Sequence, residues 1–543
     1  MTGSAPTETI MVMTAMTSTA HWPADVSAPL LPTTIGSILR AAAELAPGRT
    51  ALVDGCPDPE RRRTWTYAEF LATAERAARA LLGRFSPGEP VAVWSANSPR
   101  WLMIEFAAGL AGLVLVPVNP AYQAEELAHV LGHSRARGIF VADRYRAGDL
   151  PEILASVRDR LPELREVIAL ADWDAFLASA DDGVELPEVD PASPAQVLYT
   201  SGTTGLPKGA VLTHRGLTNN ARLAWAAAGL RAGEAGVNPM PFFHVAGAGM
   251  LALGLVQYAC TQVVPPYFEP GLVLELTETY RSVLLGGVPT MLHAMLGHPA
   301  CDKRDLSSLR LGMSGGAPVP APLVRQFEER LRIPLLTTFA QTESSCSITV
   351  TRPDDTVAER AETVGRPLPQ AEVKIVGLGD SQTVPFGTVG EICVRGYLVM
   401  DAYLGDKGAT SAAIDDAGWL RTGDLGSMDE RGYLRIRGRV KEMIIRGGEN
   451  VYPREIEDVL IAHPAVAQVA VVGVASAFWG EEVGAVIRPA GAAAPEPDEL
   501  REFCRQRLAA FKVPVHWLFL DSFPLTATGK VRKDVLSARF AGN

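Results

Sequence analysis

Hydrophobic residues of helical spacing and of strand spacing alternate through the first half of the chain. Thr66 and Glu69 fit a capping box, and apolar residues then recur at helical spacing over residues 70–82. Further strands are expected at Val91–Trp94, Val114–Val118 and Gly138–Val141, and further helices from Ser98 and at Glu125–Leu131. Repeated units of one strand and one helix predict parallel sheets with helices on both faces.

The pattern changes after about residue 370, where glycines interrupt a region richer in strands. A further unit begins near Lys441, and its length of about a hundred residues is enough for a separate domain. The strands expected in this half are Glu372–Val376, Gly390–Arg395, Val469–Val474 and Val483–Ile487, and the helices are Arg454–Ala462 and Glu499–Leu508. We therefore expect an α/β protein in three parts. They are a loose N-terminal extension (1–30), a large domain of parallel-sheet subdomains plus a β-rich subdomain (31–440), and a small α+β domain (441–543).

Composition then narrows the class of protein. Hydrophobic residues make up 47% of the chain and charged residues 20%, as in globular proteins. The net charge of −11 argues against a general nucleic-acid binder, which needs a basic face to neutralise phosphates. Six scattered cysteines form no CxxC pair, which fits reduced thiols in the cytoplasm, where we expect the protein. The apolar stretch Val245–Val264 contains two glutamines and three glycines, so we expect a buried helix and strand there and no membrane span.

The strongest chemical signal is the string YTSGTTGLPKG, which runs from Tyr199 to Gly209. Two glycines let the backbone approach an anion closely, three hydroxyls can donate to phosphate oxygens, and a lysine adds positive charge. These residues are Gly202, Gly205, Ser201, Thr203, Thr204 and Lys208. The spacing is not GxxxxGK[ST], so the string is not the common nucleotide-triphosphatase loop.

The string resembles the phosphate loop of the adenylate-forming superfamily, which includes acyl-CoA synthetases, peptide-synthetase adenylation domains and luciferases. Further motifs that resemble this family follow in order. They are PFFH (241–244), SGGAP (314–318), FAQTE (339–343), GRP (365–367), TGD (422–424), GR (438–439), GGENVYP (447–453) and TGK (528–530). The resemblance covers nearly all of the chain after residue 35. It implies an enzyme that adenylates an acid with ATP and releases pyrophosphate.

The resemblance also implies a role for each motif. Thr342 would hydrogen-bond phosphate, and Glu343 would bind Mg²⁺, a hard cation that needs few protein carboxylates where it bridges phosphates. Lys530 would reach both the acid and the α-phosphate, where two anions have to meet. His244 would lie beside the acid pocket and completes the catalytic candidates. Phe339 would stack on adenine, and Asp424 and Arg439 would contact the ribose. The other predicted ATP-binding residues are Thr200, Ser201, Gly202, Thr203, Thr204, Gly205, Lys208, Gly315, Gly316 and Ala317.

A second half-reaction, in which the acyl group passes to coenzyme A, is implied as well. By resemblance the C-terminal domain rotates about Lys441, and the loop at Gly447 and Gly448 then replaces Lys530 at the reacting atoms. The GGENVYP string resembles free-standing CoA ligases more than peptide-synthetase domains. We therefore expect ATP, Mg²⁺ and coenzyme A as cofactors and a small-molecule acid as substrate. The sequence leaves a monomer and a homodimer open.

The chain departs from the family where the acid pocket is expected. Thr338, Phe339 and Ala340 stand where the family usually has Gly-Tyr-Gly. The added side chains should narrow the pocket, and Thr338 should make it more polar. With His244 and Gly316, Thr338 and Ala340 are the predicted pocket residues, and they favour a small, cyclic or aromatic acid.

Other hypotheses stay open at this point. The acceptor could be a carrier protein or an amine, and a diazo-forming ligase that activates nitrite would suit a narrow, polar pocket. A non-catalytic nucleotide-binding scaffold would have kept only the fold. Intact Lys208, Glu343 and Lys530 argue against the scaffold, because a binder needs no lysine aimed at the α-phosphate.

Overall fold

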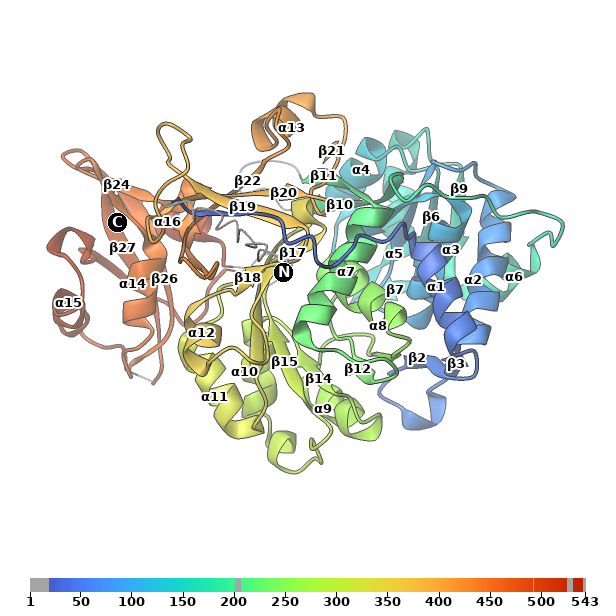
Figure 1. Cartoon of the computed structure of the whole chain (residues 1–543), viewed down its shortest axis with the longest axis horizontal. Coiled ribbons are helices and arrows are strands. Elements are labelled where there is room, and N and C mark those ends of the chain that lie inside the picture. The colour runs from blue at the N-terminus through green and yellow to red at the C-terminus, as the bar shows by residue number, and fades with distance from the viewer. Residues whose placement is uncertain (1–18, 201–206, 492, 525–530, 541–543) are drawn as a thin grey trace, which may run out of the picture.

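Three large sheets frame the N-terminal part of the chain, and a fourth sheet frames the C-terminal part (Figure 1). The computed structural model describes residues 19–200, 207–491, 493–524 and 531–540. Its mixture of parallel sheets and packed helices confirms the α/β fold that the hydrophobic pattern predicts.

The first sheet has seven strands in the order β21-β11-β10-β5-β4-β6-β9. The strands from β10 to β9 run parallel, whereas β11 and β21 extend the sheet antiparallel. Alternate strand residues enter two cores, one shared with α2 and α3 and one with α4 and α5, so helices cover both faces. The strands are β4 (Pro90–Trp94), β5 (Val114–Val118), β6 (Gly138–Val141), β9 (Glu166–Ala169), β10 (Pro194–Thr200), β11 (Lys208–Thr213) and β21 (Ala402–Tyr403). The helices are α2 (Tyr67–Leu82), α3 (Pro99–Ala111), α4 (Ala124–His133), α5 (Leu150–Val157) and α6 (Trp173–Ala178), and a hairpin of β7 (Arg144–Tyr145) and β8 (Gly148–Asp149) precedes α5.

The second sheet has nine strands in the order β18-β17-β16-β15-β14-β12-β13-β2-β3, with a parallel centre and antiparallel edges. One face joins the main core with α1, α7 and α8, and the other packs on α9, α10 and α11. The strands are β2 (Thr50–Asp54), β3 (Thr64–Thr66), β12 (Ala235–Val237), β13 (Thr261–Val264), β14 (Leu284–Gly286), β15 (Leu311–Ser314), β16 (Leu335–Gln341), β17 (Cys346–Val350) and β18 (Arg366–Pro367). The helices are α1 (Ile35–Leu45), α7 (His214–Ala228), α8 (Leu253–Gln257), α9 (Pro270–Thr279), α10 (Pro289–Gly297), α11 (Ala321–Leu331) and α12 (Val357–Glu362).

The third sheet is antiparallel and corrects one expectation. Its order is β1-β19-β20-β22-β23, and β1 (His21–Trp22) belongs to the segment expected to be a loose extension. Ala20 is fully buried, and the backbone of Thr19 bridges to Pro385. Residues 19–22 are therefore part of the third sheet and not a loose extension, because the edge strand β19 has unpaired backbone groups with which β1 can pair. Residues 1–18 lie outside the described residues. The other elements here are β19 (Ala371–Val376), β20 (Gly390–Gly396), β22 (Leu420–Met428), β23 (Leu434–Arg439) and α13 (Lys407–Ala413).

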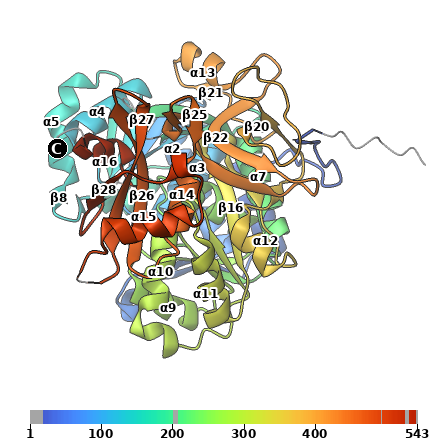
Figure 2. The same ribbon diagram turned by 90° about the vertical axis from the view of Figure 1, so that its left-hand side faces the viewer.

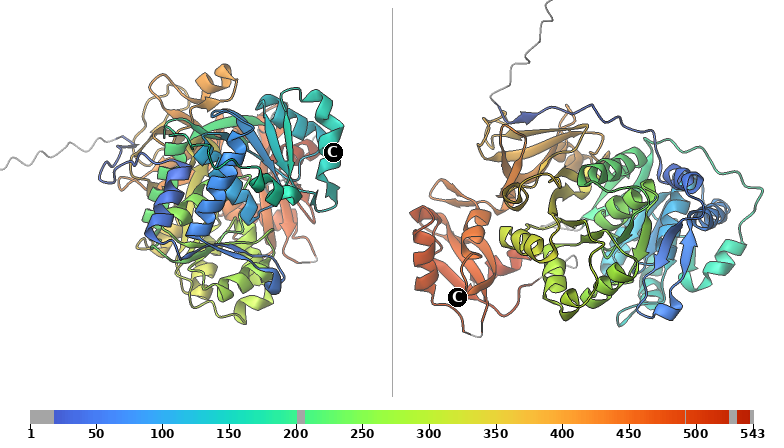
Figure 3. Two further views of the ribbon diagram at one scale, coloured as in Figure 1. Left: turned by 90° about the vertical axis from the view of Figure 1, so that its right-hand side faces the viewer. Right: turned by 60° about the horizontal axis from the view of Figure 1, so that its bottom comes forward.

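The C-terminal part builds its own sheet and cores from residues after 443 (Figures 1 and 2). Its elements lie at one end of the molecule, next to the third sheet, where α14 contacts β23 (Figures 1 and 3). The strands are β24 (Ile444–Arg446), β25 (Glu449–Val451), β26 (Val466–Ser476), β27 (Gly480–Pro489) and β28 (His516–Phe519). The helices are α14 (Pro453–Leu460), α15 (Pro497–Arg505) and α16 (Lys533–Phe540). The boundary at Lys441 stays a prediction.

Local signals explain why several elements begin where they do. The predicted capping box is present at α2: Thr66 Oγ1 accepts from the Glu69 backbone N–H at 3.2 Å, and Glu69 Oε2 accepts from the Thr66 N–H at 2.7 Å. Ser98 caps α3, and Gly112, with φ of 67°, ends that helix in the left-handed conformation.

The apolar stretch at 245–264 is a buried helix followed by a buried strand, as expected. Its first turns, Ala246–Ala252, are π-helical, a form that often occurs at functional sites. Among the helices of the described residues, none combines the length and the apolar character that crossing a membrane requires.

Candidate active site

The end of the phosphate loop and the predicted metal ligand meet on one tyrosine. Lys208 opens β11, and its Nζ lies 5.1 Å from the centre of the Tyr403 ring. The Tyr403 hydroxyl donates to Glu343 Oε1 at 2.8 Å. Burial and the nearby Glu343 carboxylate raise the pKa of Tyr403, so its hydroxyl stays protonated at neutral pH. A predicted cation and a predicted metal ligand, 135 residues apart in the numbering, thus share one neighbour.

The predicted ribose-binding residues also lie together. Antiparallel pairing of β22 and β23 places Asp424 opposite Arg439, and Arg439 Nε donates to Asp424 Oδ1 at 3.0 Å. Gln341 Nε2 donates to Asp424 Oδ2 at 2.6 Å and to the Thr422 carbonyl at 2.8 Å. Asp424 is only 6% exposed, so these donors orient a carboxylate that has lost much of its water. Gln341 precedes Thr342 and so links the ribose-binding residues to the phosphate-binding residues.

A buried asparagine holds the turn that carries Thr342 and Glu343. The turn spans Thr342–Ser344 and ends at Ser345, whose φ is 53°. Asn220 of α7 is fully buried and donates to the Ser344 carbonyl at 3.5 Å, at the end of the turn, and to the Ser347 carbonyl at 2.7 Å. It also accepts from the Ser347 N–H at 2.9 Å. The Glu343 carbonyl accepts from the Met400 N–H at 2.9 Å. The backbone of the turn is therefore fixed from two sides.

Strands β15 and β16 bring the predicted pocket residues to the carboxyl edge of the second sheet, where ligands bind in open α/β sheets. A Cβ on Gly315 would lie 2.6 Å from Thr338 Cγ2, so only glycine fits beside this threonine. Gly316 has φ of 74°, and Ala317 follows it. The Thr338 hydroxyl donates to the Thr349 carbonyl at 2.9 Å and lies 3.1 Å from Ser347 Oγ. Its polar group is thus directed at β17, while its methyl group packs beside Gly315.

His244 lies in the bend that leads into the π-helical segment, Ala246–Ala252. Its carbonyl accepts from the Gly247 N–H at 3.0 Å, and its own N–H donates to the Pro241 carbonyl at 3.1 Å. A Cβ on Gly247 would lie 2.3 Å from the Pro241 carbonyl oxygen, so the bend requires glycine there. Asn97 accepts from the Phe242 N–H at 2.9 Å and donates to the Met240 carbonyl at 2.8 Å. These hydrogen bonds, together with the close approach of Gly247 to Pro241, fix the backbone position of His244.

Two histidines on α4 contact the flanks of the phosphate loop. His129 Nε2 lies 2.9 Å from the Pro207 carbonyl, and His133 Nδ1 lies 2.9 Å from the Tyr199 hydroxyl. Thr200 pairs with Lys208 across β10 and β11. Five predicted loop residues lie outside the described residues: Ser201, Gly202, Thr203, Thr204 and Gly205. Lys530 lies outside them as well.

The remaining predicted residues differ in exposure. Phe339 is 8% exposed and packs into the main core, and its stacking on adenine stays a prediction. Gly447 and Gly448, with φ of 60° and 90°, form the exposed two-residue turn of the β24–β25 hairpin. Lys441 is exposed in the short 3₁₀ turn Val440–Glu442 between β23 and β24. Ala340 is half-buried in β16.

Glu343 suits a cation that is shared with phosphate. Among the residues that the structure describes, no three His, Cys, Asp or Glu side chains gather into a metal site of their own. Mg²⁺ bound beside ATP needs only one or two protein carboxylates. Glu343 is half-buried, and the hydroxyl of Tyr403 donates a hydrogen bond to only one of the two carboxylate oxygens of Glu343. The donor set therefore fits a magnesium–nucleotide complex.

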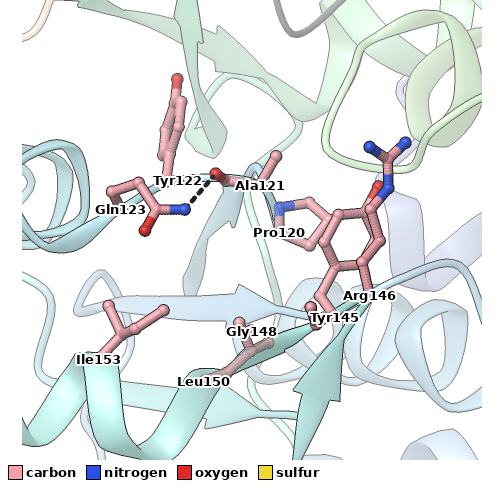
Figure 4. A pocket seen from close by; sticks show the side chains of 10 residues that line it. Pro120, Ala121, Tyr122, Gln123, Tyr145, Arg146, Gly148, Leu150 and Ile153 are labelled. Atoms are coloured by element: carbon pink, nitrogen blue, oxygen red, sulfur yellow. Dashed lines mark hydrogen bonds between the residues drawn. The ribbon is translucent and has the colours of Figure 1, made fainter.

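The hollow lined by Tyr122, Gln123, Tyr145 and Arg146 is separate from these residues (Figure 4). It has a volume of about 220 Å³ and lies between the start of α4 and the β7–β8 hairpin. None of the residues predicted for adenylation lines it, so it is not part of the candidate active site.

Two residues that the sequence did not single out contact the predicted site residues in the structure. Gln341 stands inside the FAQTE string, which was the available signal for it. Tyr403 stands in no motif that the sequence singled out, and it meets Glu343 only through the fold.

The chain is similar to known proteins over most of its length. Residues 39–404 match the family "AMP-binding enzyme", and residues 455–530 match "AMP-binding enzyme C-terminal domain". The chain is 40% identical to the putative acyl-CoA synthetase YngI of Bacillus subtilis (strain 168), over 93% of this chain and 97% of that protein. It is 33% identical to the mitochondrial medium-chain acyl-CoA ligase ACSF2 of Macaca fascicularis, over 93% and 86%. The crystal structure of the anthranilate CoA ligase AuaEII in complex with anthranoyl-AMP has a TM-score of 0.85 at 25% identity, over 94% and 98%.

Proposed function

The chain belongs to the AMP-binding enzyme family and is an AMP-forming acid–CoA ligase, and we propose that its acid is a small, cyclic or aromatic carboxylate. ATP and coenzyme A are its co-substrates. The roles of the individual site residues, the need for Mg²⁺ and a cytoplasmic location are parts of the same proposal.

One observation supports the assignment of the site residues. An unbroken series of contacts runs from Lys208 through Tyr403 to Glu343, along the chain to Gln341, and on to Asp424 and Arg439. A nucleotide bound along this series would meet a cation and a carboxylate at its phosphates and a second carboxylate at its ribose. That order of groups matches the order of parts in ATP.

The proposed reaction has two steps. In the first, a carboxylate oxygen of the acid attacks the α-phosphorus, the bond from that phosphorus to the bridging oxygen breaks, and pyrophosphate leaves. Lys208 and Lys530 would offset the phosphate charge, which otherwise repels the incoming carboxylate. In the second step the sulfur of coenzyme A attacks the acyl carbon, the acyl–oxygen bond breaks, and AMP leaves while the thiol proton is released.

Glu343 would hold Mg²⁺ at the phosphates, and the hydroxyl of Thr342 would donate to a phosphate oxygen. When bound, the metal lowers the effective charge of the triphosphate and orients it. Asp424, held by Arg439 and Gln341, would accept both ribose hydroxyls and so fix the nucleotide along the site.

Two acid classes have support. The Thr338 methyl group beside Gly315 favours a compact acid, and AuaEII, whose structure holds anthranoyl-AMP, is an example of a ligase for an aromatic acid. A medium-chain fatty acid is the second candidate, because relatives at 33% identity are medium-chain acyl-CoA ligases. Transfer to an amine or a carrier protein and activation of nitrite are further outcomes of the test below.

A pyrophosphate-release assay over a panel of acids tests the proposal. The panel contains benzoate and anthranilate, a cyclohexane carboxylate, acetate, octanoate and nitrite, each with and without coenzyme A, and Lys530→Ala is the negative control. We expect thioester only when coenzyme A is present. We also expect kcat/KM for a cyclic or aromatic acid to exceed that for octanoate by roughly 10-fold or more, the scale of a pocket-size effect. A higher kcat/KM for octanoate would favour the second candidate, and no pyrophosphate from any acid would contradict the proposal.

A further inference from the structure

Tyr403 lies between two charged groups that have opposite tasks in the proposed reaction. Its hydroxyl donates to Glu343 Oε1 at 2.8 Å, and Lys208 Nζ lies 5.1 Å from the centre of its ring. Within the described residues, no ion pair at 4.0 Å or closer joins Lys208 directly to Glu343. The tyrosine is therefore a shared neighbour of the lysine and the glutamate.

The backbone of Tyr403 is fixed on both sides. Strand β21 pairs with β11 so that Tyr403 stands opposite Ala210, two residues after Lys208. The Leu404 N–H donates to the Gly209 carbonyl at 2.8 Å, and the Met400 N–H donates to the Glu343 carbonyl at 2.9 Å. The Tyr403 N–H donates to Thr410 Oγ1 at 3.0 Å. Residues 400–404 thus connect the strand after the phosphate loop to the turn that carries Glu343. Strands β11 and β21 lie side by side in Figure 1.

The two contacts of the side chain act on different charges. A neutral hydroxyl orients the Glu343 carboxylate without cancelling its charge, so the carboxylate can still bind a cation. The ring face attracts the Lys208 ammonium group, but less strongly than a desolvated carboxylate would, so the cation is still available to phosphate. A leucine here would supply neither contact.

We propose that Tyr403 is a positioning residue for the adenylation step: its hydroxyl aims Glu343 at the divalent cation, and its ring keeps Lys208 apart from that carboxylate. The proposal rests on the proposed function, since it takes Glu343 as the metal ligand and Lys208 as a phosphate-binding cation. It adds a residue that no motif of the family resemblance supplied.

Binding of Mn²⁺ with a non-hydrolysable ATP analogue, followed by electron paramagnetic resonance, tests the proposal without turnover. We expect Tyr403→Phe to weaken Mn²⁺ binding about 10-fold or more, the usual scale for losing an outer hydrogen bond to a metal ligand. The affinity for the analogue without metal should stay unchanged, because the ring still faces Lys208. Tyr403→Leu should lower both affinities. An unchanged Mn²⁺ affinity in Tyr403→Phe would overturn the proposal.

Tyr433 offers a matched control in the same chain. Its hydroxyl donates to Asp355 Oδ1 at 2.7 Å, and Arg366 Cζ lies 5.1 Å from its ring centre, away from the candidate site. Tyr433→Phe loses the same kind of hydrogen bond and should leave Mn²⁺ affinity unchanged. An equal loss in both variants would mean that general destabilisation, not positioning, is measured.

A double-mutant cycle separates this inference from the proposed function. If Glu343→Gln keeps wild-type Mn²⁺ affinity, Glu343 is not the metal ligand, and the site assignment fails with the inference. If Glu343→Gln loses the metal, we expect Tyr403→Phe to add no further loss in that background, because its effect acts through Glu343. Losses that add would show that Tyr403 acts by another route and would overturn the inference alone.

Discussion

Glu105 is the clearest case of a single residue whose charge state depends on the fold. It lies in α3, is 1% exposed, and accepts a hydrogen bond from Gln196 Nε2 at 2.6 Å. Its second oxygen has no partner among the described residues. Burial raises the pKa of Glu105 to about 8, so this carboxyl is mostly protonated at neutral pH. Gln196 lies in β10, the strand that leads to the phosphate loop, so this hydrogen bond joins α3 to that strand.

We predict that Glu105 makes the folded protein less stable as pH rises from about 4.5 to about 8. The unfolded carboxyl releases its proton near its ordinary pKa of 4.5, whereas the folded one keeps its proton up to about 8. Within this window the native state binds more protons than the unfolded state, so the free energy of unfolding falls with pH. Glu105→Gln resembles the protonated acid and should exceed the wild type at pH 8 by on the order of 1–3 kcal/mol. Thermal melts at several pH values check this, with exposed Glu44→Gln as control, and parallel Tm–pH curves for Glu105→Gln and the wild type would contradict it.

Whether the sequence alone identifies a residue of the candidate site depends on whether that residue stands in a short motif. The sequence singles out Lys208, Glu343, Asp424 and Arg439 because each stands in a short string. The structure brings them into one connected series of contacts, and their roles stay predictions. Tyr403 could not be predicted, because its partner Glu343 is 60 residues away and only strand pairing brings them together. The direction of the Thr338 hydroxyl, toward the Thr349 carbonyl of β17, likewise depends on a strand that no pattern around Thr338 reveals.

At the scale of elements, the sequence predicts a helix or strand correctly where neighbouring residues in the chain determine it. The capping box at Thr66 and the buried strands at 91–94 and 114–118 lie where the pattern puts them. The strand at His21–Trp22 was missed, because two residues carry no periodicity and their pairing depends on the distant strand β19. The π-helical turns at 246–252 were missed as well, since they depend on the contact of Gly247 with the Pro241 carbonyl.

The edge formed by β15 and β16 leads to a prediction on acid preference. Thr338→Ser keeps the hydroxyl that donates to Thr349 and removes the methyl group beside Gly315. We expect kcat/KM to shift toward bulkier acids by roughly 10-fold or more, within the 10–200-fold range for about one methylene group. Stability should change little, because the hydrogen bonds across β16 and β17 remain.

Kinetics over an acid series of increasing size measure that shift. Thr337→Ser is the matched control, because Thr337 is the preceding residue of β16 and its hydroxyl donates to the Thr363 carbonyl at 3.0 Å. An acid profile that stays the same in Thr338→Ser would show that the methyl group does not border the acid.

At the scale of the whole molecule, ion pairs hold the chain on either side of the predicted boundary at Lys441. Arg439 is held by Asp424 at 3.0 Å, on the side of the large N-terminal part. Glu442 is held by Lys533 at 3.0 Å, and Lys533 also pairs with Glu457 at 2.7 Å, on the side of the C-terminal part. Only Val440 and Lys441 lie between these anchors. In this short connection, where Lys441 is exposed and Val440 is half-buried, few backbone dihedrals would have to change to turn one part against the other.

The last prediction tests that turning. Adenylation and thioester formation need different groups at one reaction centre, and a rotation about Lys441 would exchange Lys530 for the turn at Gly447–Gly448. Proline fixes φ at about −65°, so Lys441→Pro should hold one arrangement. We expect this variant to keep pyrophosphate release within a few fold, while its rate of thioester formation falls by on the order of 10²-fold, the cost of a misplaced reacting group. Lys441→Ala, which loses the charge but keeps backbone freedom, should change both rates little. If Lys441→Pro forms thioester at the wild-type rate, the two half-reactions do not depend on rotation at this residue, and the anchors at Arg439 and Glu442 only stabilise a fixed arrangement.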